Sequence, residues 1–481
     1  MPSLVGSEMC IRDSNKYSLT DGITEKIYNK ILNQKMDMGN NSDQPMGLKF
    51  GPIVLLPDIE KRHLFTLFFG AFFGIASMAF VNVFNYSIFS ALDIPQEEFG
   101  SVAGTLTAVQ EVVVVSVIGL FGALSDKIGR RFVYSLGFFL LGIGYFIYPL
   151  ADSPTELYFF RIFVALGCAA NTVMLPTVAN DYVHGSTRGR LIAFTSILNG
   201  LGLVLIISTF RNFATFYEEL QAPEYLINLG YDSANWAQYV FWSASTMVFI
   251  VSVVLFFNLK KGTAEATAKK DSYFSTLGVA VKEAKNPRVA LAYTAGVVSR
   301  GDLELVSTFF ALWLGIEFES LGMSKSEAQK MAALLYVAVQ ACAIPGALLI
   351  NFFIDKFDRV LALAISMGIA ATGYLYLGFI EDVQGTQMYI GVGLLGLGEI
   401  FANISAISLI GSVAPAKARG AVIGGFSFFG AVGIFLVAGI GGQIFDSISP
   451  TAPFTMVGIA NLVLLMLALL LLFLERRKKE N

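Results

Sequence analysis

Long apolar stretches separated by short polar gaps recur along the whole chain. They predict membrane-spanning helices near residues 64–91, 99–124, 132–150, 157–179, 190–210, 236–259, 289–314, 331–354, 360–380, 388–412, 421–445 and 453–474. A bilayer core of about 30 Å requires roughly 20 residues of α-helix, and each stretch is long enough. The pattern therefore predicts an all-α polytopic membrane protein with twelve transmembrane helices.

The composition agrees with lipid as the main solvent. The 481 residues are 55% hydrophobic and 14% charged, which is more apolar side chain than one soluble core encloses. A net charge of −3 is too small to indicate a nucleic-acid partner. Cys10, Cys168 and Cys342 support neither a disulfide framework nor a zinc site, so we expect no cofactor and no metal.

The basic residues are distributed unequally between the loops. An even number of spans places both termini on one side, and 28 of the 33 Lys and Arg residues fall on that side. Arg211, Lys325 and Lys330 fall on the other side, and two more lie within spans. Because positively charged loops stay in the cytoplasm, we expect both termini to be cytoplasmic, in the plasma (inner) membrane.

Two segments outside the spans carry a helical pattern. Ile23, Ile27 and Ile31 recur at every fourth position and predict a short amphipathic helix at the membrane surface. A second amphipathic stretch runs from Ser272 to Ala284 in the longest basic segment. The loop at 212–235 is long but has no recognisable motif.

The first fourteen residues resemble a translated sequencing adapter, with an ordinary disordered tail as the alternative. The basic segment divides the spans six and six, which marks a domain boundary. The predicted regions are a cytoplasmic N-terminal tail at 1–60, a six-helix bundle at 61–259, a cytoplasmic linker at 260–288, a second six-helix bundle at 289–475 and a basic tail at 476–481.

The two groups of spans carry matching motifs. Asp126-Lys-x-x-Arg130 follows the second span, and Asp355-Lys-x-x-Arg359 follows the eighth, 229 residues later. The pairs that share an offset of 231 are Gly167 and Gly398, Arg188 and Arg419, and Gly189 and Gly420. Offsets that agree so closely predict the duplication of a six-helix unit.

The loop after the second span, Gly122-x-x-x-Asp126-Lys127-x-Gly129-Arg130-Arg131, resembles the signature loop of the major facilitator superfamily (MFS). Arg161 with Gly167 is similar to a second, looser motif of that family. The resemblance covers residues 61–475, and the second copy of the loop departs from it at Asn351 and Asp358. It implies two pseudo-symmetric bundles and alternating access. The gating-loop residues would be Gly122, Asp126, Lys127, Gly129, Arg130, Arg131, Asp355 and Arg359.

The residue types in this loop suit a gate even without the family resemblance. Gly122 lets helices approach closely, and Gly129 permits a left-handed turn. Asp126 can cap a neighbouring helix or pair with Arg130, and such contacts can form in one conformation and break in another. The alternative is a basic stop signal that anchors the loop to lipid headgroups.

Ionisable residues within the spans are candidates for function, because each costs at least ~2.5–3.5 kcal/mol there. They are Glu111, Arg161, Arg300, Asp302, Glu304 and Glu399. Arg300 and Glu304 are four apart and can neutralise each other, whereas Asp302 points elsewhere and needs another partner. Gly301 weakens the helix, as discontinuous transporter helices require. A structural salt bridge or a position at the end of a span is the alternative for each charge.

In the family that the chain resembles, the first, fourth, seventh and tenth helices line a central cavity. The residues placed on or near it are Asn82, Asn85, Asn171, Arg300, Asp302, Glu304, Glu399 and Asn403. Removal from water favours the neutral form of a carboxylate, so the acidic excess can hold a proton or attract a cation. The asparagines can hydrogen-bond a solute or join helices. The two histidines lie at span ends and do not supply this site.

These features predict a secondary active transporter, a proton-coupled symporter of a small polar metabolite. Asp302 and Glu399 are the expected proton carriers, and Arg300 contacts an anionic group or pairs switchably with Glu304. Proton-coupled efflux of drugs or metabolites is the alternative, although the fifth span lacks the Gly-Pro mark of drug antiporters. A non-transporting sensor is a third hypothesis. No phosphate-binding loop or nucleophile–base pair indicates an enzyme. We expect a monomer whose partners are the bilayer, a small-molecule solute and a proton.

Overall fold

A computed structural model describes residues 48–220, 227–228, 230–262, 273–415 and 418–480. The amphipathic helix expected around Ile23 to Ile31 and the first fourteen residues lie outside this part. A hairpin of β1 (Lys49–Phe50) and β2 (Ile53–Val54) precedes the first span.

The described helices follow the expected order of spans. The first half contains α2 (Lys61–Val83), α3 (Asn85–Ala91), α4 (Phe99–Ile128), α5 (Arg130–Ile147), α6 (Pro154–Tyr182), α7 (Arg188–Glu219) and α9 (Trp236–Asn258), with the 3-10 turns η2 (Gln96–Glu98), η3 (Tyr148–Leu150), η4 (Gly185–Thr187) and η5 (Ser233–Asn235). The second half contains α10 (Tyr273–Glu283), α11 (Pro287–Leu305), the π-helical turn η6 (Val306–Phe310), α12 (Ala311–Ser320), α13 (Lys325–Lys356), α14 (Arg359–Gly378), α15 (Thr386–Val413), α16 (Arg419–Ser447) and α17 (Ala452–Glu480).

The prediction of an all-α polytopic membrane protein is confirmed. Among the described residues, 11 helices are long and apolar enough to cross a membrane. The seventh expected span, 289–314, consists of α11, η6 and α12 in succession. The helix is regular at Gly301, which lies within α11, and the irregular turn comes later, at η6. Gly301 packs closely against Val437 of α16. The fifth span also continues in α7 to Glu219, past the expected end at 210.

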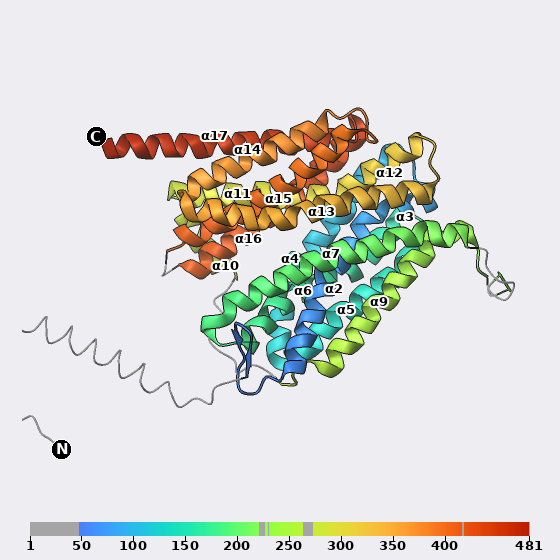
Figure 1. The fold of residues 1–481 in the computed structure, drawn as a ribbon, viewed down its shortest axis with the longest axis horizontal. Coiled ribbons are helices and arrows are strands. Elements are labelled where there is room, and N and C mark those ends of the chain that lie inside the picture. Colours follow the sequence, from blue (N-terminus) through green and yellow to red (C-terminus); the bar gives the residue numbers. More distant parts are fainter. Residues whose placement is uncertain (1–47, 221–226, 229, 263–272, 416–417, 481) are drawn as a thin grey trace, which may run out of the picture.

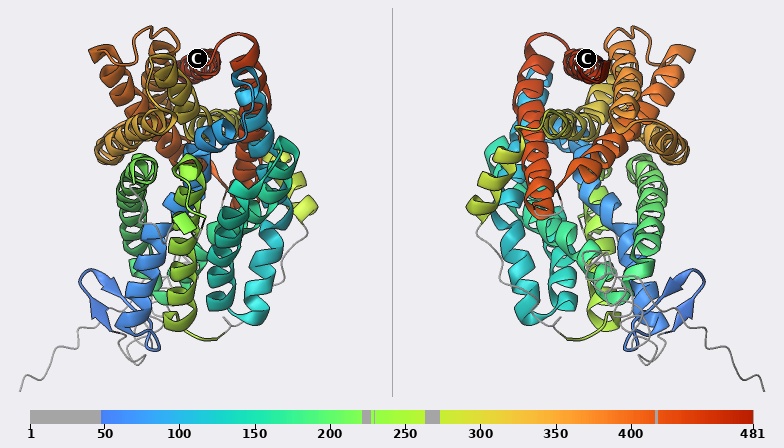
Figure 2. Two further views of the ribbon diagram at one scale, coloured as in Figure 1. Left: turned by 90° about the vertical axis from the view of Figure 1, so that its right-hand side faces the viewer. Right: turned by 90° about the vertical axis from the view of Figure 1, so that its left-hand side faces the viewer.

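The helices form two groups that meet along one seam (Figures 1 and 2). We call the helix ends near Lys61, Arg188 and Lys356 the terminal face, and the ends near Ala91, Glu219 and Ser320 the opposite face. In Figure 1 the helices of the two groups lie close together around α3 and α12 and run at an angle to each other from there.

Equivalent glycines pack the interior of both halves. Gly202 of α7 faces the backbone carbonyl of Phe72 in α2, and Gly433 of α16 faces that of Val297 in α11. A Cβ at either glycine would overlap the carbonyl oxygen, so each pair of helices is in backbone contact. The two glycines are separated by 231 residues, the offset of the sequence repeat.

Two segments near the terminal face cover helix ends. The hairpin, which falls in the region expected to be a tail, is held by a bridge between Leu55 and Val183 and by the N–H of His184 on the carbonyl of Val54. The amphipathic helix expected at 272–284 is confirmed as α10. Ala280 of α10 is buried against α16, and its carbonyl accepts from the Tyr293 hydroxyl at 3.1 Å.

Candidate functional site

A polar cluster joins the two halves at their seam. Arg161 of α6 donates to Oδ1 of Asn82 in α2. Nδ2 of Asn82 lies 3.4 Å from Oε1 of Glu304 in α11 and 3.5 Å from Oγ1 of Thr308 in η6. Thr308 donates to Glu304 at 2.6 Å and lies 3.2 Å from Oγ1 of Thr107 in α4. Asn82 therefore connects a buried cation of the first half to a carboxylate of the second.

Irregular helix segments position this cluster. Asn82 stands just before Phe84, where α2 ends and α3 begins with a change of direction. Glu304 stands just before η6, which carries Thr308. Broken helices at the contact between two repeats are typical of solute sites in transporters, because they free backbone groups and re-aim side chains.

Charges around the cluster are incompletely paired. Arg161 is fully buried, and its Nε and Nη1 have no hydrogen-bond partner among the described residues. Glu111 of α4 is within electrostatic range of Glu304 and Arg300, yet no ion pair between these three side chains occurs in the described part of the chain. The cluster thus has donors and acceptors to offer a further polar group.

Arg300 does not form the expected pair with Glu304, four residues away. The Glu304 carboxylate is engaged by Thr308 and Asn82, while the stem of Arg300 lies over Gly430 of α16, where an added Cβ would be 2.8 Å from Cγ. Arg300 is exposed, and it makes no side-chain hydrogen bond within the residues that the structure describes. A guanidinium in this state is available to an anion.

Asp302, which the family resemblance places on or near the central cavity, contacts helices of the second half. It is fully buried, and its Oδ1 accepts from Nδ2 of Asn461 in α17 at 3.0 Å. Its backbone carbonyl accepts from the hydroxyl of Tyr374 in α14 at 3.0 Å. Asp302 points to α14 and α17 because it lies about 200° around the helix from Arg300. Oδ2 has no partner among the described residues.

Glu399 of α15 is the second buried carboxylate of this half, with 3% of its surface exposed. The side chain of Gln340 in α13 lies close to it, and Oε2 is without a partner in the described part of the chain. Glu399 and Asp302 are within electrostatic range of each other. Tyr336 of α13 is likewise within electrostatic range of both Glu399 and Glu304.

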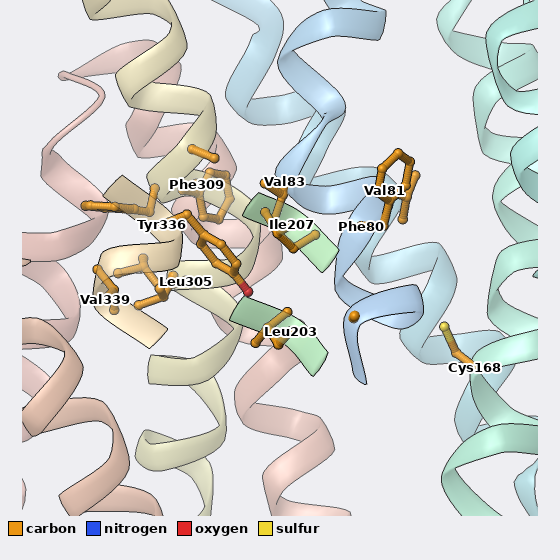
Figure 3. Close-up of a cluster of buried hydrophobic side chains, with 14 of the residues drawn as sticks. Phe80, Val81, Val83, Cys168, Leu203, Ile207, Leu305, Phe309, Tyr336 and Val339 are labelled. Atoms are coloured by element: carbon orange, nitrogen blue, oxygen red, sulfur yellow. The ribbon is translucent and has the colours of Figure 1, made fainter. Parts of the chain in front are cut away.

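The seam beside Tyr336 is otherwise apolar. Figure 3 shows Tyr336 next to Leu203 and Ile207 of α7, with Leu305 and Phe309 of the seventh span nearby. These side chains are buried and come from both halves. Apolar contact of this kind joins the halves through non-directional burial of apolar surface.

The other expected asparagines have different surroundings. Asn85 accepts from the Tyr148 hydroxyl at 3.3 Å, and Asn171 packs against Gly137 of α5, so both face the interior of the first half. Asn403 is half-buried and makes no side-chain hydrogen bond within the described residues. Of the four, Asn82 is the one that hydrogen-bonds across the halves.

Several partners in these clusters were not among the predicted site residues: Thr107, Thr308, Asn461, Gln340 and Tyr336. Asn461 and Gln340 are amides within apolar windows, and this signal could have identified them. The threonines give no comparable signal, because Ser and Thr are common in membrane helices.

The gating loop forms its contacts within the first half. Arg130 pairs with Asp126 at 2.6 Å and Asp181 at 3.0 Å, and it also donates to Ser125. Gly129 has a φ of 99°, as a left-handed turn requires. The remaining placements are Gly122 within α4, Lys127 exposed, and the guanidinium of Arg131 4.8 Å above the ring of Phe256.

The corresponding loop of the second half is also internally bonded. Arg359 donates to the carbonyl of Ile354. Arg288 binds both oxygens of Glu475 at 2.8 and 2.6 Å and lies 3.2 Å from Asp358. The Asp355 side chain lies outside the described part of the structure.

Polar contacts between the halves occur on the opposite face. Asp446 of α16 accepts from the N–H groups of Gly100 and Ser101 in α4 at 2.7 Å each. Glu319 of α12 accepts from the Tyr86 hydroxyl of α3 at 2.6 Å. The others are Glu218 with Ser324 and Ser326, Lys330 with Thr215, Gln96 with Glu319, Lys325 with Asp93 and with the carbonyl of Ser90, and Gln329 with the carbonyl of Val83. This face is therefore held closed, while the ion pairs described on the terminal face stay within one half.

Comparisons with known proteins bear on this arrangement. The family model described as Major Facilitator Superfamily matches residues 67–318 and 293–481. The magnetosome protein MamH of Paramagnetospirillum magneticum is 26% identical over 396 residues, covering 81% of this chain and 87% of MamH. MamZ of the same organism is 24% identical, and the match covers 78% of this chain and 57% of MamZ.

Solved structures share the fold. The nucleoside transporter NupG superposes with a TM-score of 0.68 at 14% identity, over 84% of this chain and 98% of NupG. A bacterial homologue of the human lysosomal transporter Spinster, in an inward-facing and occupied conformation, gives a TM-score of 0.60 at 15% identity, over 86% and 96% of the two chains.

Proposed function

This chain belongs to the Major Facilitator Superfamily, and we propose that it moves a small polar metabolite together with a proton by alternating access. It is a membrane transporter of this family and not an enzyme. The observation that carries the proposal is the cluster of Arg161, Asn82 and Glu304, to which both halves contribute. A solute bound there contacts both halves and responds to their relative movement.

The distribution of contacts supports a two-state cycle. Asp446 and Glu319 bond across the halves on the opposite face, whereas Arg130 and Arg288 bond within their own halves on the terminal face. The excess of Lys and Arg on the terminal face supports a cytoplasmic position for it. The described state is then closed to the outside, and transport requires these bonds to break.

Asp302 and Glu399 are proposed as the proton carriers. Each is buried, and each has one carboxylate oxygen without a partner among the described residues. Burial disfavours a charged carboxylate, and a second carboxylate nearby disfavours it further. Tyr336 is within electrostatic range of both Glu399 and Glu304, so the proposed proton site lies near the cluster that contacts both halves.

Arg300 is proposed as the contact for an anionic group of the solute. It is exposed and forms no ion pair with Glu304 among the described residues, although Glu111 is close enough to attract it. Binding of a carboxylate or phosphate would supply the missing partner. The names of MamH and MamZ state no solute and do not narrow this class.

The test is the thermal stability of the purified, detergent-solubilised protein against a panel of metabolites and drugs at two pH values. A ligand at about 100 times its Kd stabilises the folded state by roughly 2.7 kcal/mol. We expect one class of polar metabolite to stabilise the wild type and to fail with Asn82→Leu. Asn258→Ala is the control, because Asn258 bonds only locally, to the carbonyl of Val254.

A metabolite that stabilises the wild type is then tested in proteoliposomes for solute-driven proton uptake. We expect uptake in the wild type and a decrease of about tenfold in Glu399→Gln. Stabilisation by unrelated hydrophobic drugs would move the assignment to efflux. Solute uptake that is unaffected by a pH gradient would overturn proton coupling and leave the solute site intact.

A further inference from the structure

A basic cavity of about 660 Å³ lies on the terminal face of the first half, away from the seam cluster. Four segments line it: the residues after the hairpin, the start of α5, the end of α6 with the following loop, and the end of α9 with the first residues of the linker. Its volume falls in the range of about 300–1,000 Å³ that is usual for small-molecule sites.

Positive charge dominates the lining. The cationic side chains are Arg130, Arg131, Arg188, Lys260 and Lys261, and the carboxylates are Asp58 and Asp181. Asp181 is bound by Arg130, and Asp58 lies 3.6 Å from Lys260. Arg188 and Lys261 are exposed and form no ion pair within the residues that the structure describes. The cavity therefore keeps positive charge that its own carboxylates do not neutralise.

Backbone geometry adds to this charge. Arg130 and Arg131 begin α5 directly after Gly129, and Arg188 begins α7. Helix N-termini present unpaired N–H groups and the positive end of the helix dipole. Two such ends contribute residues to one basic cavity, a combination that suits a phosphate group.

We propose that this cavity binds a phosphate-bearing anion, either the headgroup of an anionic phospholipid or a soluble phosphate. Arginine side chains hold phosphate in a bidentate manner, and Arg131 and Arg188 are the residues available for it. Basic pockets between transmembrane helices bind the headgroups of anionic lipids. The site is independent of the solute proposed above.

Binding here would act on the connection between the halves. Lys260, Lys261 and Gly262 start the segment that leads from α9 to the second half. Gly262 lies close to Gly129, since a Cβ on Gly129 would be 3.0 Å from the Gly262 carbonyl oxygen. An anion held between Arg188 and Lys261 ties the start of the linker to the loops of the first half.

The test is binding by the purified full-length protein of two probes, a short-chain phosphatidylglycerol and inorganic phosphate, with short-chain phosphatidylcholine and chloride as matched references. The variant is Arg188→Gln with Lys261→Gln, which we expect to fold because both side chains are exposed. The control is Arg419→Gln with Lys356→Gln, since Arg419 occupies the position of Arg188 in the second half.

We expect at least one phosphate probe to bind, and the variant to weaken it by about tenfold while the control changes it by less than about twofold. Binding of phosphatidylglycerol alone identifies a lipid headgroup, and binding of both identifies the phosphate itself. Equal weakening in variant and control would overturn the proposal, because general surface charge would then explain the binding. Absence of binding by both phosphate probes would overturn it as well.

Discussion

The two halves share their packing and differ in their buried chemistry. Gly167 packs against Leu141 of α5, and its equivalent Gly398 packs against Ala370 of α14. The residue that follows each glycine is Cys168 in the first half and Glu399 in the second, and both are buried. Helix contacts are therefore common to both copies, whereas the buried carboxylates Asp302 and Glu399 belong to the second half.

The loops on the terminal face show the same contrast. Gly129 and Asp358 are equivalent by the 229-residue offset. Gly129 turns the chain with a φ of 99°, while Asp358 has a φ of −56° and its Oδ1 accepts from the N–H of Val360 at 2.9 Å. One copy starts its third helix with a glycine turn, and the other starts it with a side-chain cap. Asp358 departs from the family motif, but the helix still begins at the equivalent position.

The largest effect is expected where the halves are alike. Gly202→Ala and Gly433→Ala should each destabilise the protein by about 3 kcal/mol or more, because the new methyl group overlaps a backbone carbonyl of the neighbouring helix. Thermal unfolding of the purified protein measures this.

Gly200→Ala and Gly439→Ala are the matched controls on the same two helices. An added Cβ meets only ordinary contacts at Gly200 and none within 4 Å at Gly439. These variants should be neutral or slightly stabilising, since alanine favours a helix by up to about 1 kcal/mol over glycine. Similar losses at all four sites would show that backbone contact is not the cause.

The next effect concerns two equivalent contacts between the halves on the opposite face. Asp446 bonds the start of α4, while Thr215, its equivalent by the 231-residue offset, receives Lys330 of α13. Asp446→Ala removes two bonds to a charged acceptor, each worth about 1.5–3 kcal/mol, whereas Thr215→Ala removes one. Asp446→Ala should therefore shift the equilibrium further towards opening of this face.

Spin labels on Asp152→Cys and Glu381→Cys, exposed residues of the two halves on the opposite face, report the separation. The cysteines of the wild type are replaced first. Asp382→Ala is the control, because Asp382 caps only its own loop, at the N–H of Gln384. An unchanged distance distribution in Asp446→Ala would show that this contact does not hold the face closed.

How far the sequence predicts this contrast depends on the kind of feature. Apolar windows and repeat offsets located the spans and the duplication, since both are properties of the chain itself. The charges in the spans correctly pointed to buried positions for Arg161, Asp302 and Glu399. Helical spacing predicted that Asp302 points away from Arg300, but its partners were not predictable, because they depend on how α11 is rotated against α14 and α17.

Other features depend on contacts that no local pattern records. The separation of Arg300 from Glu304 results from Gly430 on one side and Asn82 on the other. The hairpin around Leu55 has only two-residue strands, and its bridge to Val183 joins positions far apart in sequence.

A smaller effect tests the difference between Cys168 and Glu399. Glu399→Gln should lower solute-driven proton uptake by about tenfold, because the amide keeps the shape and cannot carry a proton. Cys168→Ala at the equivalent position should change uptake by less than about twofold. Infrared spectra provide a readout that needs no solute, since a protonated carboxyl group has its own carbonyl band. If the band persists in both Glu399→Gln and Asp302→Asn, this result contradicts the proposed proton site.

The smallest effect separates the two roles of Asp358. Loss of the cap in Asp358→Ala should cost about 1 kcal/mol, and Asp358→Gly should cost only a few tenths, because glycine is itself a tolerated N-cap. Both changes remove the contact with Arg288 equally, and Arg288 keeps its two bonds to Glu475. Thermal unfolding of the two variants decides the matter. Equal losses would mean that Asp358 stabilises the loop through Arg288, and the second copy would then differ from the first in its ion pairing and not in how its helix begins.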